Sequence, residues 1–211
     1  MNLLIIPFTY HWIMKKAIGS PKTLLDLGCG NGDFSYDLFK NDKFQITGVE
    51  LYPESIKQAK SKNIYSKVVK GDIVKLPIGL KKHYDVVLVS QAIEHLTKKK
   101  GHKAIQEWEK RAKRVVISTP VGFVPFHQLE LSEQDQNPYQ KHLSGWEVED
   151  FEKMGYKVYG QGWGFLYRNS FIKQLPSIFF PAINIISFIT SPVMYFSPRL
   201  AMYQIAVKEI L

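Results

Sequence analysis

Glu94, its neighbour His95 and the distant His142 are the side chains of this sequence best suited to acid–base chemistry. An imidazole titrates near neutral pH, so it can take a proton from a hydroxyl group that is about to react. The same carboxylate and imidazoles could instead hold a divalent cation. A lone histidine often does neither and simply packs or caps a helix. The elements that position these residues therefore decide which interpretation holds.

A glycine-rich stretch near the N-terminus predicts where a ligand would bind. Thr23–Leu27 is apolar enough for a short buried strand, and the chain resumes as a helix at Phe34. Between them Gly28, Gly30 and Gly32 let the backbone turn sharply and come close to a ligand. The first N–H groups of the helix can bind the ligand's polar end. The unit is typical of sites for nucleotide-like molecules.

The spacing Asp26-x-Gly28-x-Gly30-x-Gly32 resembles the first motif of the class I S-adenosylmethionine-dependent methyltransferases. A dinucleotide dehydrogenase, the alternative, would carry Gly-x-Gly-x-x-Gly after the strand. The resemblance implies S-adenosylmethionine as the cofactor. It also implies that Asp26 holds the amino group of the ligand, directly or through water, while the glycines pass beneath its methionine part.

Two later strands end in acids that complete the implied cofactor site. Glu50 can accept both ribose hydroxyls. The resemblance assigns Asp72 to the adenine amino group, with Leu51 and Ile73 flanking the ring, although Gly71-Asp72 could be no more than a turn. The predicted cofactor-binding residues are Asp26, Gly28, Gly30, Glu50, Leu51, Asp72, Ile73 and Gln91.

A second resemblance concerns the residues that could do chemistry. Gln91-x-x-Glu94-His95, followed by His142 shortly before Trp146, is similar to ubiquinone-pathway O-methyltransferases and to small-RNA 3′-terminal 2′-O-methyltransferases. Those branches carry Glu-x-x-Glu-His and depend on a metal. Gln91 stands here in place of the first Glu and is a poorer ligand for a hard cation. We expect Glu94, His95 and His142 to be catalytic or to contact substrate. A divalent metal is the weaker expectation, and no metal ligand is assigned.

Strand-like and helix-like segments alternate along the chain, which predicts an α/β Rossmann-like, doubly wound seven-stranded sheet. We expect one methyltransferase domain over residues 1–211. Ser144 is the expected cap of the helix that Gly155 closes. Expected strands are Thr23–Leu27, Phe44–Val49, Lys67–Lys70, Tyr84–Val89, Val115–Thr119, Tyr156–Tyr159 and Ala201–Lys208. Expected helices include Phe8–Ile18, Phe34–Phe39, Pro53–Lys62 and Ser90–Lys113.

An apolar insert, residues 164–200, precedes the last strand. No charged residue lies between Lys173 and Arg199, and this run is long enough to span a bilayer. Its prolines oppose one continuous helix, and the last strand must return to the same sheet. We therefore expect a broken helical hairpin in the membrane interface, or a lid over an apolar substrate. Packing against the domain itself, a dimer contact and a true span remain as alternatives.

The bulk composition narrows the partners and the compartment. The net charge of +9 over 211 residues suits an anionic partner, or merely keeps the chain soluble. The lysine-rich region from Lys98 to Arg114 is interleaved with acids, so a solvated helix face is favoured over a nucleic-acid surface. Cys29 is the only cysteine, and the N-terminus makes a poor signal peptide. A cytoplasmic protein, peripheral at a membrane if it contacts one, is expected.

These observations together predict an enzyme that methylates a small or lipid-like acceptor, with oxygen favoured over nitrogen or carbon. RNA 2′-O-methylation is the alternative within enzymes. A non-catalytic, membrane-associated scaffold with a methyltransferase fold is the alternative outside them. The acceptor itself is not encoded in any motif, because its pocket would be built from the segments 1–18 and 121–198.

Overall fold

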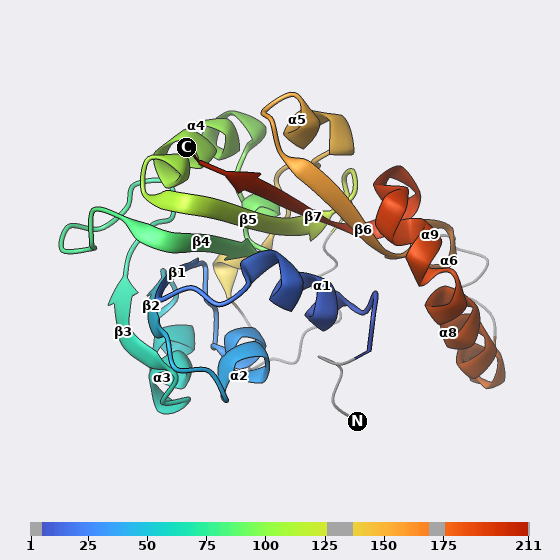
Figure 1. Ribbon diagram of the computed structural model, residues 1–211, viewed down its shortest axis with the longest axis horizontal. Helices are drawn as coiled ribbons and strands as arrows, with labels where there is room; N and C mark the ends of the chain where they lie inside the picture. Colours follow the sequence, from blue (N-terminus) through green and yellow to red (C-terminus); the bar gives the residue numbers. More distant parts are fainter. Residues whose placement is uncertain (1–5, 126–136, 169–175, 211) are drawn as a thin grey trace.

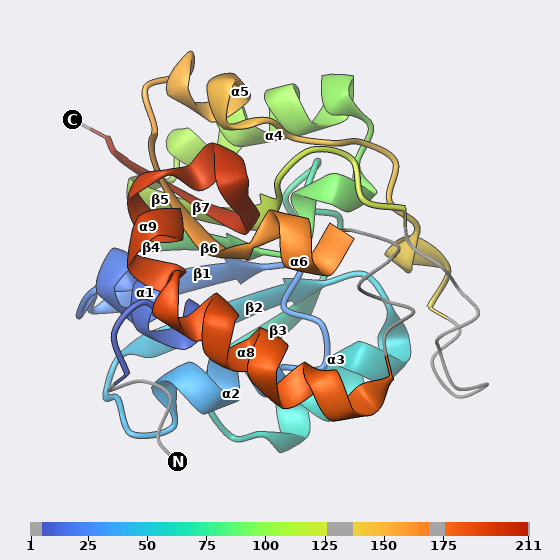
Figure 2. The same cartoon turned by 90° about the vertical axis from the view of Figure 1, so that its right-hand side faces the viewer.

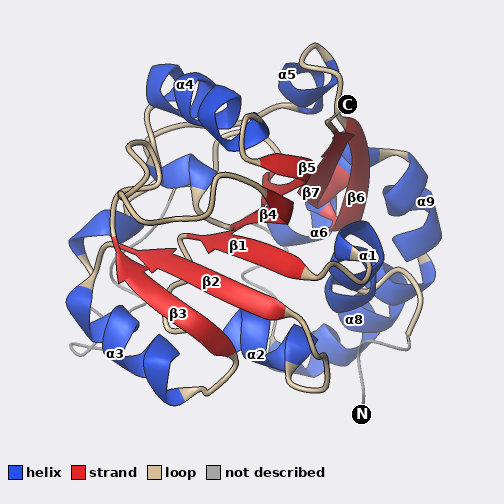
Figure 3. Ribbon diagram, turned by 60° about the vertical axis from the view of Figure 1, so that its left-hand side comes forward, coloured by secondary structure: helices blue, strands red, loops and turns tan. Residues whose placement is uncertain are grey.

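The computed structural model describes residues 6–125, 137–168 and 176–210. Their strands form one seven-stranded sheet in the order β3-β2-β1-β4-β5-β7-β6 (Figures 1 and 3). The strands are β1 (Thr23–Leu27), β2 (Gln45–Glu50), β3 (Tyr65–Lys70), β4 (Tyr84–Ser90), β5 (Ala112–Pro120), β6 (Lys157–Trp163) and β7 (Ala201–Glu209). Only β7 runs antiparallel to its neighbours, between β5 and β6. The predicted Rossmann-like, doubly wound sheet is confirmed.

Successive side chains of a strand point to opposite faces of the sheet. In the central strands the side chains on both faces are apolar, and helices cover both faces. Leu25 and Val87 face the layer of α4 (Lys98–Glu109) and α5 (Val148–Glu152). Leu24 and Val86 face the layer of α1 (Tyr10–Ile18) and α2 (Asp33–Phe39). Figure 1 shows these two layers above and below the strands, with α3 (Pro53–Ser61) beside α2. The central strands are apolar on both faces because both faces are covered.

Two predicted helix boundaries were wrong for identifiable reasons. The expected helix from Ser90 is interrupted, because Gln91 has a φ of 49° and the chain forms only the short turn η2 (Ile93–His95) before α4 begins at Lys98. The expected cap Ser144 does not begin α5. Glu147 is the cap there, in a capping box with Asp150. Ser144 instead accepts a hydrogen bond from the indole of Trp146, at 3.0 Å.

The apolar insert leaves and rejoins the sheet at one edge, since Trp163 at the end of β6 pairs with Ala201 at the start of β7. Its described elements are α6 (Gly164–Arg168), η6 (Ser177–Phe179), α8 (Phe180–Ile189), α9 (Ser191–Phe196) and η7 (Pro198–Leu200). The predicted break is confirmed, with Pro192 in the first turn of α9. Residues 169–175, where the uncharged run begins, lie outside the described residues. No helix in the described part of the chain is long and apolar enough to cross a bilayer.

Candidate functional site

The glycine loop between β1 and α2 is held tightly against the end of β2. The backbone N–H groups of Gly28 and Cys29 donate to the Val49 carbonyl, at 2.8 and 3.2 Å. Gly28 has a φ of 72°, and a Cβ built there would lie 2.7 Å from the Cβ of Ala92. A larger residue would therefore be strained by its backbone and blocked by its neighbour. The loop needs glycine at this position.

The Glu50 carboxylate closes the loop from the neighbouring strand. Its Oε2 accepts the N–H of Gly30 at 3.0 Å, and its Oε1 accepts the N–H groups of Leu51 and Tyr52, both at 2.8 Å. Glu50 is 8% exposed and borders the cavity described below. A carboxylate has lone pairs beyond those that these three bonds use. It is thus fixed in place and still able to accept hydroxyl groups of a ligand.

Asp26, predicted to contact the ligand, lies beneath the loop. It is 3% exposed, and its Oδ2 accepts hydrogen bonds from the hydroxyls of Ser35 at 2.6 Å and Tyr65 at 2.9 Å. Burial raises the pKa of Asp26 to about 6, although these two hydrogen bonds act in the opposite direction. Asp26 does not line the cavity. In this conformation its visible role is to tie α2 and β3 to β1, and its contact with a ligand stays a prediction.

A cavity of about 410 Å³ opens at the carboxyl ends of β1, β2 and β4, where α/β sheets of this kind bind ligands. Asp72 is fixed at its rim by a hydrogen bond from the N–H of Val74, at 2.8 Å. Trp108 supports the floor by donating to the Ile73 carbonyl, also at 2.8 Å. Of the predicted residues, the cavity is lined by Gly28, Gly30, Glu50, Leu51, Asp72, Ile73, Gln91 and His95. Asp26, Glu94 and His142 are predicted residues that do not line it.

An unpredicted side chain, that of Tyr10 at the start of α1, contacts the turn that follows β4. The Tyr10 hydroxyl lies 2.5 Å from Ser118 Oγ and 3.1 Å from Ser90 Oγ. It also accepts a hydrogen bond at 3.4 Å from the amide of Gln91, which lines the cavity. Burial raises the pKa of Tyr10, so its phenol stays protonated at neutral pH. Tyr10 therefore orients Gln91, a role that sequence position alone does not indicate.

Glu94, His95 and His142 meet beside the cavity, which His95 lines. One ligand atom from each residue can be chosen so that all lie within 4.8 Å of one another. The two imidazole centroids are 5.0 Å apart. Glu94 is 2% exposed and accepts from the Thr119 hydroxyl at 3.0 Å. Burial raises the pKa of Glu94 to about 7 and lowers the pKa of His95 below its usual value.

Hydrogen bonds to backbone carbonyls orient both histidines. His95 Nδ1 lies 3.3 Å from the Lys141 oxygen, and His142 Nδ1 lies 2.6 Å from the Val124 oxygen. A carbonyl only accepts, so Nδ1 carries the hydrogen in each neutral ring and Nε2 keeps the lone pair. The pair can therefore accept a proton at Nε2. The same arrangement is common for histidines that ligate metals through Nε2, so the donor set fits a divalent cation as well.

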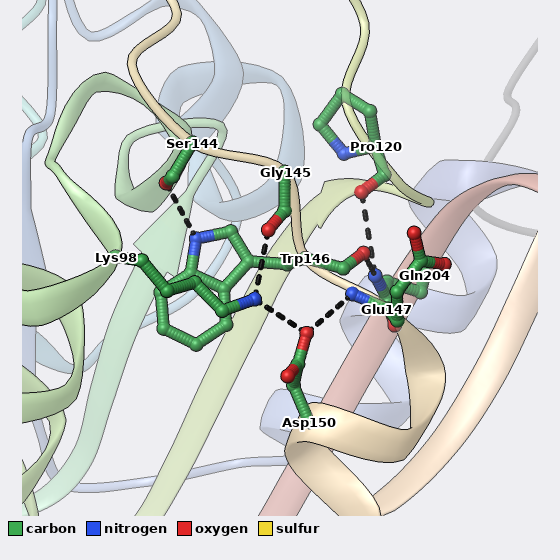
Figure 4. Close-up of polar contacts among 8 residues, drawn as sticks. All are labelled: Lys98, Pro120, Ser144, Gly145, Trp146, Glu147, Asp150 and Gln204. Carbon is green, nitrogen blue, oxygen red and sulfur yellow. Dashed lines mark hydrogen bonds and ion pairs between the residues drawn. The ribbon is translucent and has the colours of Figure 1, made fainter.

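A polar network holds the segment that carries His142 (Figure 4). The Lys98 ammonium donates to the Gly145 carbonyl at 2.7 Å, pairs with Asp150, and lies 4.0 Å from the ring centroid of Trp146. Gln204 donates to the Trp146 carbonyl at 2.6 Å. The N–H groups of residues 143 and 144 donate to the Glu94 carbonyl, at 2.8 and 3.1 Å. The segment is thus joined to α4, β7 and η2 at once.

Sequence reasoning missed a second group of cavity residues. They come from the chain after β3, from the turn after β4, from the start of α4 and from the chain on either side of His142. Because these positions meet only when the sheet has formed, the sequence holds no local signal for them. They are Gly71, Val74, Ala92, Leu96, Lys100, Asn137, Pro138, Tyr139, Gln140, Lys141 and Leu143.

Comparisons with known proteins agree with this geometry. Residues 24–114 match the family model described as a methyltransferase domain. The methyltransferase domain of bacterial CtHen1 is 20% identical with a TM-score of 0.55, and the match covers 94% of both chains. A SAM-dependent methyltransferase from Archaeoglobus fulgidus is 18% identical with a TM-score of 0.58, over 99% of this chain and 94% of that one. The small RNA methyltransferase HEN1 is 17% identical with a TM-score of 0.60, over 95% of this chain and 24% of that one. These likenesses establish the class I S-adenosylmethionine-dependent methyltransferase fold.

Proposed function

Starting from a chain that has the class I S-adenosylmethionine-dependent methyltransferase fold and a methyltransferase domain, we propose that it methylates an oxygen of a small or lipid-like acceptor. The observation that carries this proposal is the group of Glu94, His95 and His142 beside the cofactor cavity. An oxygen acceptor must lose a proton as it becomes methylated, and two oriented imidazoles are able to take it.

The cofactor would lie along the carboxyl ends of the strands. In this proposal Glu50 accepts the ribose hydroxyls, and Asp72 accepts from the adenine amino group between Leu51 and Ile73. The glycine loop allows the methionine part to pass close to the backbone. All four side chains border the same cavity, which supports the assignment.

Methyl transfer is an in-line displacement, so holding the acceptor oxygen behind the methyl carbon is the main task of the enzyme. A lone pair of the oxygen forms the new C–O bond while the S–C bond breaks. The electron pair of that bond stays on sulfur and gives a neutral thioether. The proton of the hydroxyl passes to a neutral imidazole, and His95 borders the cavity while His142 lies next to it. Burial keeps His95 neutral at pH 7 by lowering its pKa.

A divalent cation fits the same residues. Glu94, His95 and His142 would hold it through one carboxylate oxygen and two imidazole nitrogens. Bound there, it would lower the pKa of an acceptor hydroxyl. Gln91 occupies the position of a fourth ligand in the branches that the motif resembles, and its amide is held by Tyr10 and Ser118 instead. Proton removal by histidine is therefore the form of the proposal that we favour.

The acceptor class follows from the apolar insert. Its chain departs from the end of β6 and returns at the start of β7, on the same carboxyl end of the sheet as the cavity, although none of its described residues lines the cavity. An uncharged, apolar segment at this end suits a substrate with an apolar body more than a polyanion. A cytoplasmic protein that works at a membrane surface is the setting that goes with this proposal.

RNA 2′-O-methylation is the second candidate, because the fold matches that of a small RNA methyltransferase and Glu94, His95 and His142 come together as in the resemblance. The net charge of +9 is compatible with a polyanionic substrate. The substitution at Gln91 and the uncharged insert count against it.

Transfer of a radiolabelled methyl group from S-adenosylmethionine to a lipid extract or to total RNA would separate the candidates. We expect label in the lipid fraction, at least about a hundredfold less label with His95→Ala, and unchanged cofactor binding by calorimetry. Label in RNA alone would favour the second candidate. Full transfer by His95→Ala would remove His95 from the chemistry. Cofactor binding without transfer to either fraction would favour a non-catalytic scaffold.

A further inference from the structure

The helix α8 exposes apolar side chains on nearly all of its surface. Ile185, Phe188 and Ile189 are 59%, 53% and 69% exposed, whereas Ser187 is the only buried residue of this helix. A water-soluble helix normally shows the reverse, with polar residues outside and apolar ones inside. We call this surface the apolar ridge. It consists of Ile178, Phe179, Phe180, Ile185, Ile186, Phe188, Ile189, Val193 and Phe196, all between 43% and 80% exposed.

The buried side of α9 anchors the ridge to the sheet, while Val193 and Phe196 of the same helix belong to the ridge. Met194 and Tyr195 are buried, and the Tyr195 ring stacks on Tyr159 of β6 with centroids 4.8 Å apart. Gly160 allows this close approach, since a Cβ there would lie 2.2 Å from the Met194 carbonyl oxygen. Figures 1 and 2 show α8 on the outside of the molecule, beyond α9. The ridge is therefore presented by a well-packed anchor and is not a loosely placed part of the core.

The charges around the ridge indicate what would cover it. No residue from 176 to 198 is charged. Arg199 of η7 pairs with both Glu149 and Glu152, at 2.5 and 2.7 Å, so this group on α5 and η7 keeps a net charge of −1. Lys16 of α1, in contrast, pairs with no acid among the described residues. Its ammonium lies 4.8 Å from the ring centroid of Trp12 and 5.8 Å from that of Tyr195. An unneutralised lysine beside tryptophan and tyrosine is typical of a membrane–water interface.

We propose that the apolar ridge is the surface by which this protein docks on an anionic lipid bilayer. The ridge would lie in the boundary between headgroups and acyl chains, parallel to the membrane, with Lys16 near the lipid phosphates. The inference rests on the proposed function in one respect. Because the insert begins and ends at the carboxyl end of the sheet, where the cavity also opens, docking brings that end toward a lipid-like acceptor.

Flotation of the full chain with lipid vesicles tests this proposal. We expect binding to phosphatidylcholine vesicles that contain phosphatidylserine and weaker binding to phosphatidylcholine alone. The double variant Ile185→Asp/Ile189→Asp should bind at least about tenfold more weakly. Lys16→Glu should weaken binding about fivefold or more, and only to the anionic vesicles. Ile78→Asp is the matched control, because Ile78 is fully exposed in the loop between β3 and β4.

Two results would overturn the proposal. Wild-type protein that stays unbound at every lipid composition would exclude docking. A wild-type dimer in light scattering that Ile185→Asp/Ile189→Asp converts to a monomer would show that a second copy covers the ridge. Calorimetric titration of the same samples with S-adenosylmethionine should be unchanged in every variant. That control shows that each variant is folded, and it separates failure of docking from failure of the proposed enzyme.

Discussion

The cofactor edge of the sheet and the apolar ridge differ in what their side chains are bound to. At the cofactor edge the buried carboxylates are held by hydrogen bonds within the protein: Glu50 accepts three backbone N–H groups, and Asp26 accepts two hydroxyls. On the ridge large apolar groups such as Ile189 and Phe196 face outward, 69% and 75% exposed. In the proposed function, the first region would select a ligand by fixed geometry. The side chains of the second region make few contacts within the protein, so this surface is suited to contact with another molecule or a membrane.

The largest expected effect comes from removing one of the two histidines beside the cavity. His142→Ala should reduce methyl transfer by about 10²- to 10⁴-fold, because a positioned base is lost. Cofactor affinity should stay within about twofold, since His142 does not line the cavity. His83→Ala, in an exposed loop, is the control for both measurements. Unchanged transfer by His142→Ala would show that the histidine pair has only a structural role.

The buried acid Asp26 should make the free energy of unfolding depend on pH in the opposite direction from an acid at the surface. Burial raises its pKa to about 6, so the folded state binds a proton more tightly than the unfolded state does. The free energy of unfolding should therefore fall as pH rises from about 4 to about 6, by at most about 3 kcal/mol. Asp26→Asn should reduce that slope in urea unfolding curves of the cofactor-free protein and leave the part that comes from Glu94, whose pKa burial raises to about 7.

Asp85 provides the matched comparison for this pH dependence. A hydrogen bond from Lys113 lowers the pKa of Asp85 to about 2. Its contribution to stability is present above pH 4 and should be lost as pH falls toward 2. Asp85→Asn should accordingly remove only an acid-side loss. The same slope in both variants would contradict the burial argument for Asp26.

The next effect concerns space in the glycine loop. Gly28→Ala should weaken S-adenosylmethionine binding by about tenfold or more, because its φ of 72° strains an alanine and the new Cβ would meet Ala92. Gly79→Ala shares the strained φ, at 88°, but has nothing within 4 Å. Calorimetry should show unchanged binding for Gly79→Ala. Equal losses would mean that backbone strain alone, and not the loop's packing, governs affinity.

Lys98 tests whether the His142 segment depends on its clamp. Lys98→Met should lower the free energy of unfolding by about 1 kcal/mol, through loss of the bond to Gly145 and of the contact with Trp146. It should also lower kcat more than it raises KM, because the histidine pair loses its support. Lys99→Met, one residue along the same helix and exposed, should change neither quantity.

The smallest expected effect is on the ridge. Ile189→Asp should change the free energy of unfolding by no more than about 0.5 kcal/mol, because an exposed side chain loses little when it becomes polar. Met194→Asp, on the neighbouring helix but 3% exposed, should cost about 3 kcal/mol or more through burial of a charge. Urea unfolding measures both. A large loss with Ile189→Asp would show that the ridge packs against the protein in solution.

Local sequence patterns were enough for the fold and for most of the cofactor edge. The class I methyltransferase fold is confirmed, residues 24–114 match a methyltransferase domain, and seven strands lie where apolar runs predicted them. The glycine loop depends on backbone conformation within a few residues, so its position can be predicted from one short stretch of sequence. The helix start at Ser90 failed because the left-handed conformation of Gln91 is imposed by its hydrogen bond to Ser118 on another strand.

The roles of individual residues required the tertiary structure. From sequence, Glu94, His95 and His142 were candidates at separate positions, and only the fold brings their ligand atoms within 4.8 Å. Tyr10 reaches Ser118 across more than a hundred residues, which no spacing rule encodes. Asp26 lies beneath the loop, bound to Ser35 and Tyr65, and its expected contact with the ligand stays a prediction. Hydrophobic pattern and backbone propensity act locally, so the sequence determined the scaffold. Burial, pKa and the choice of which apolar surface stays exposed depend on contacts between distant segments, so only the structure decided them.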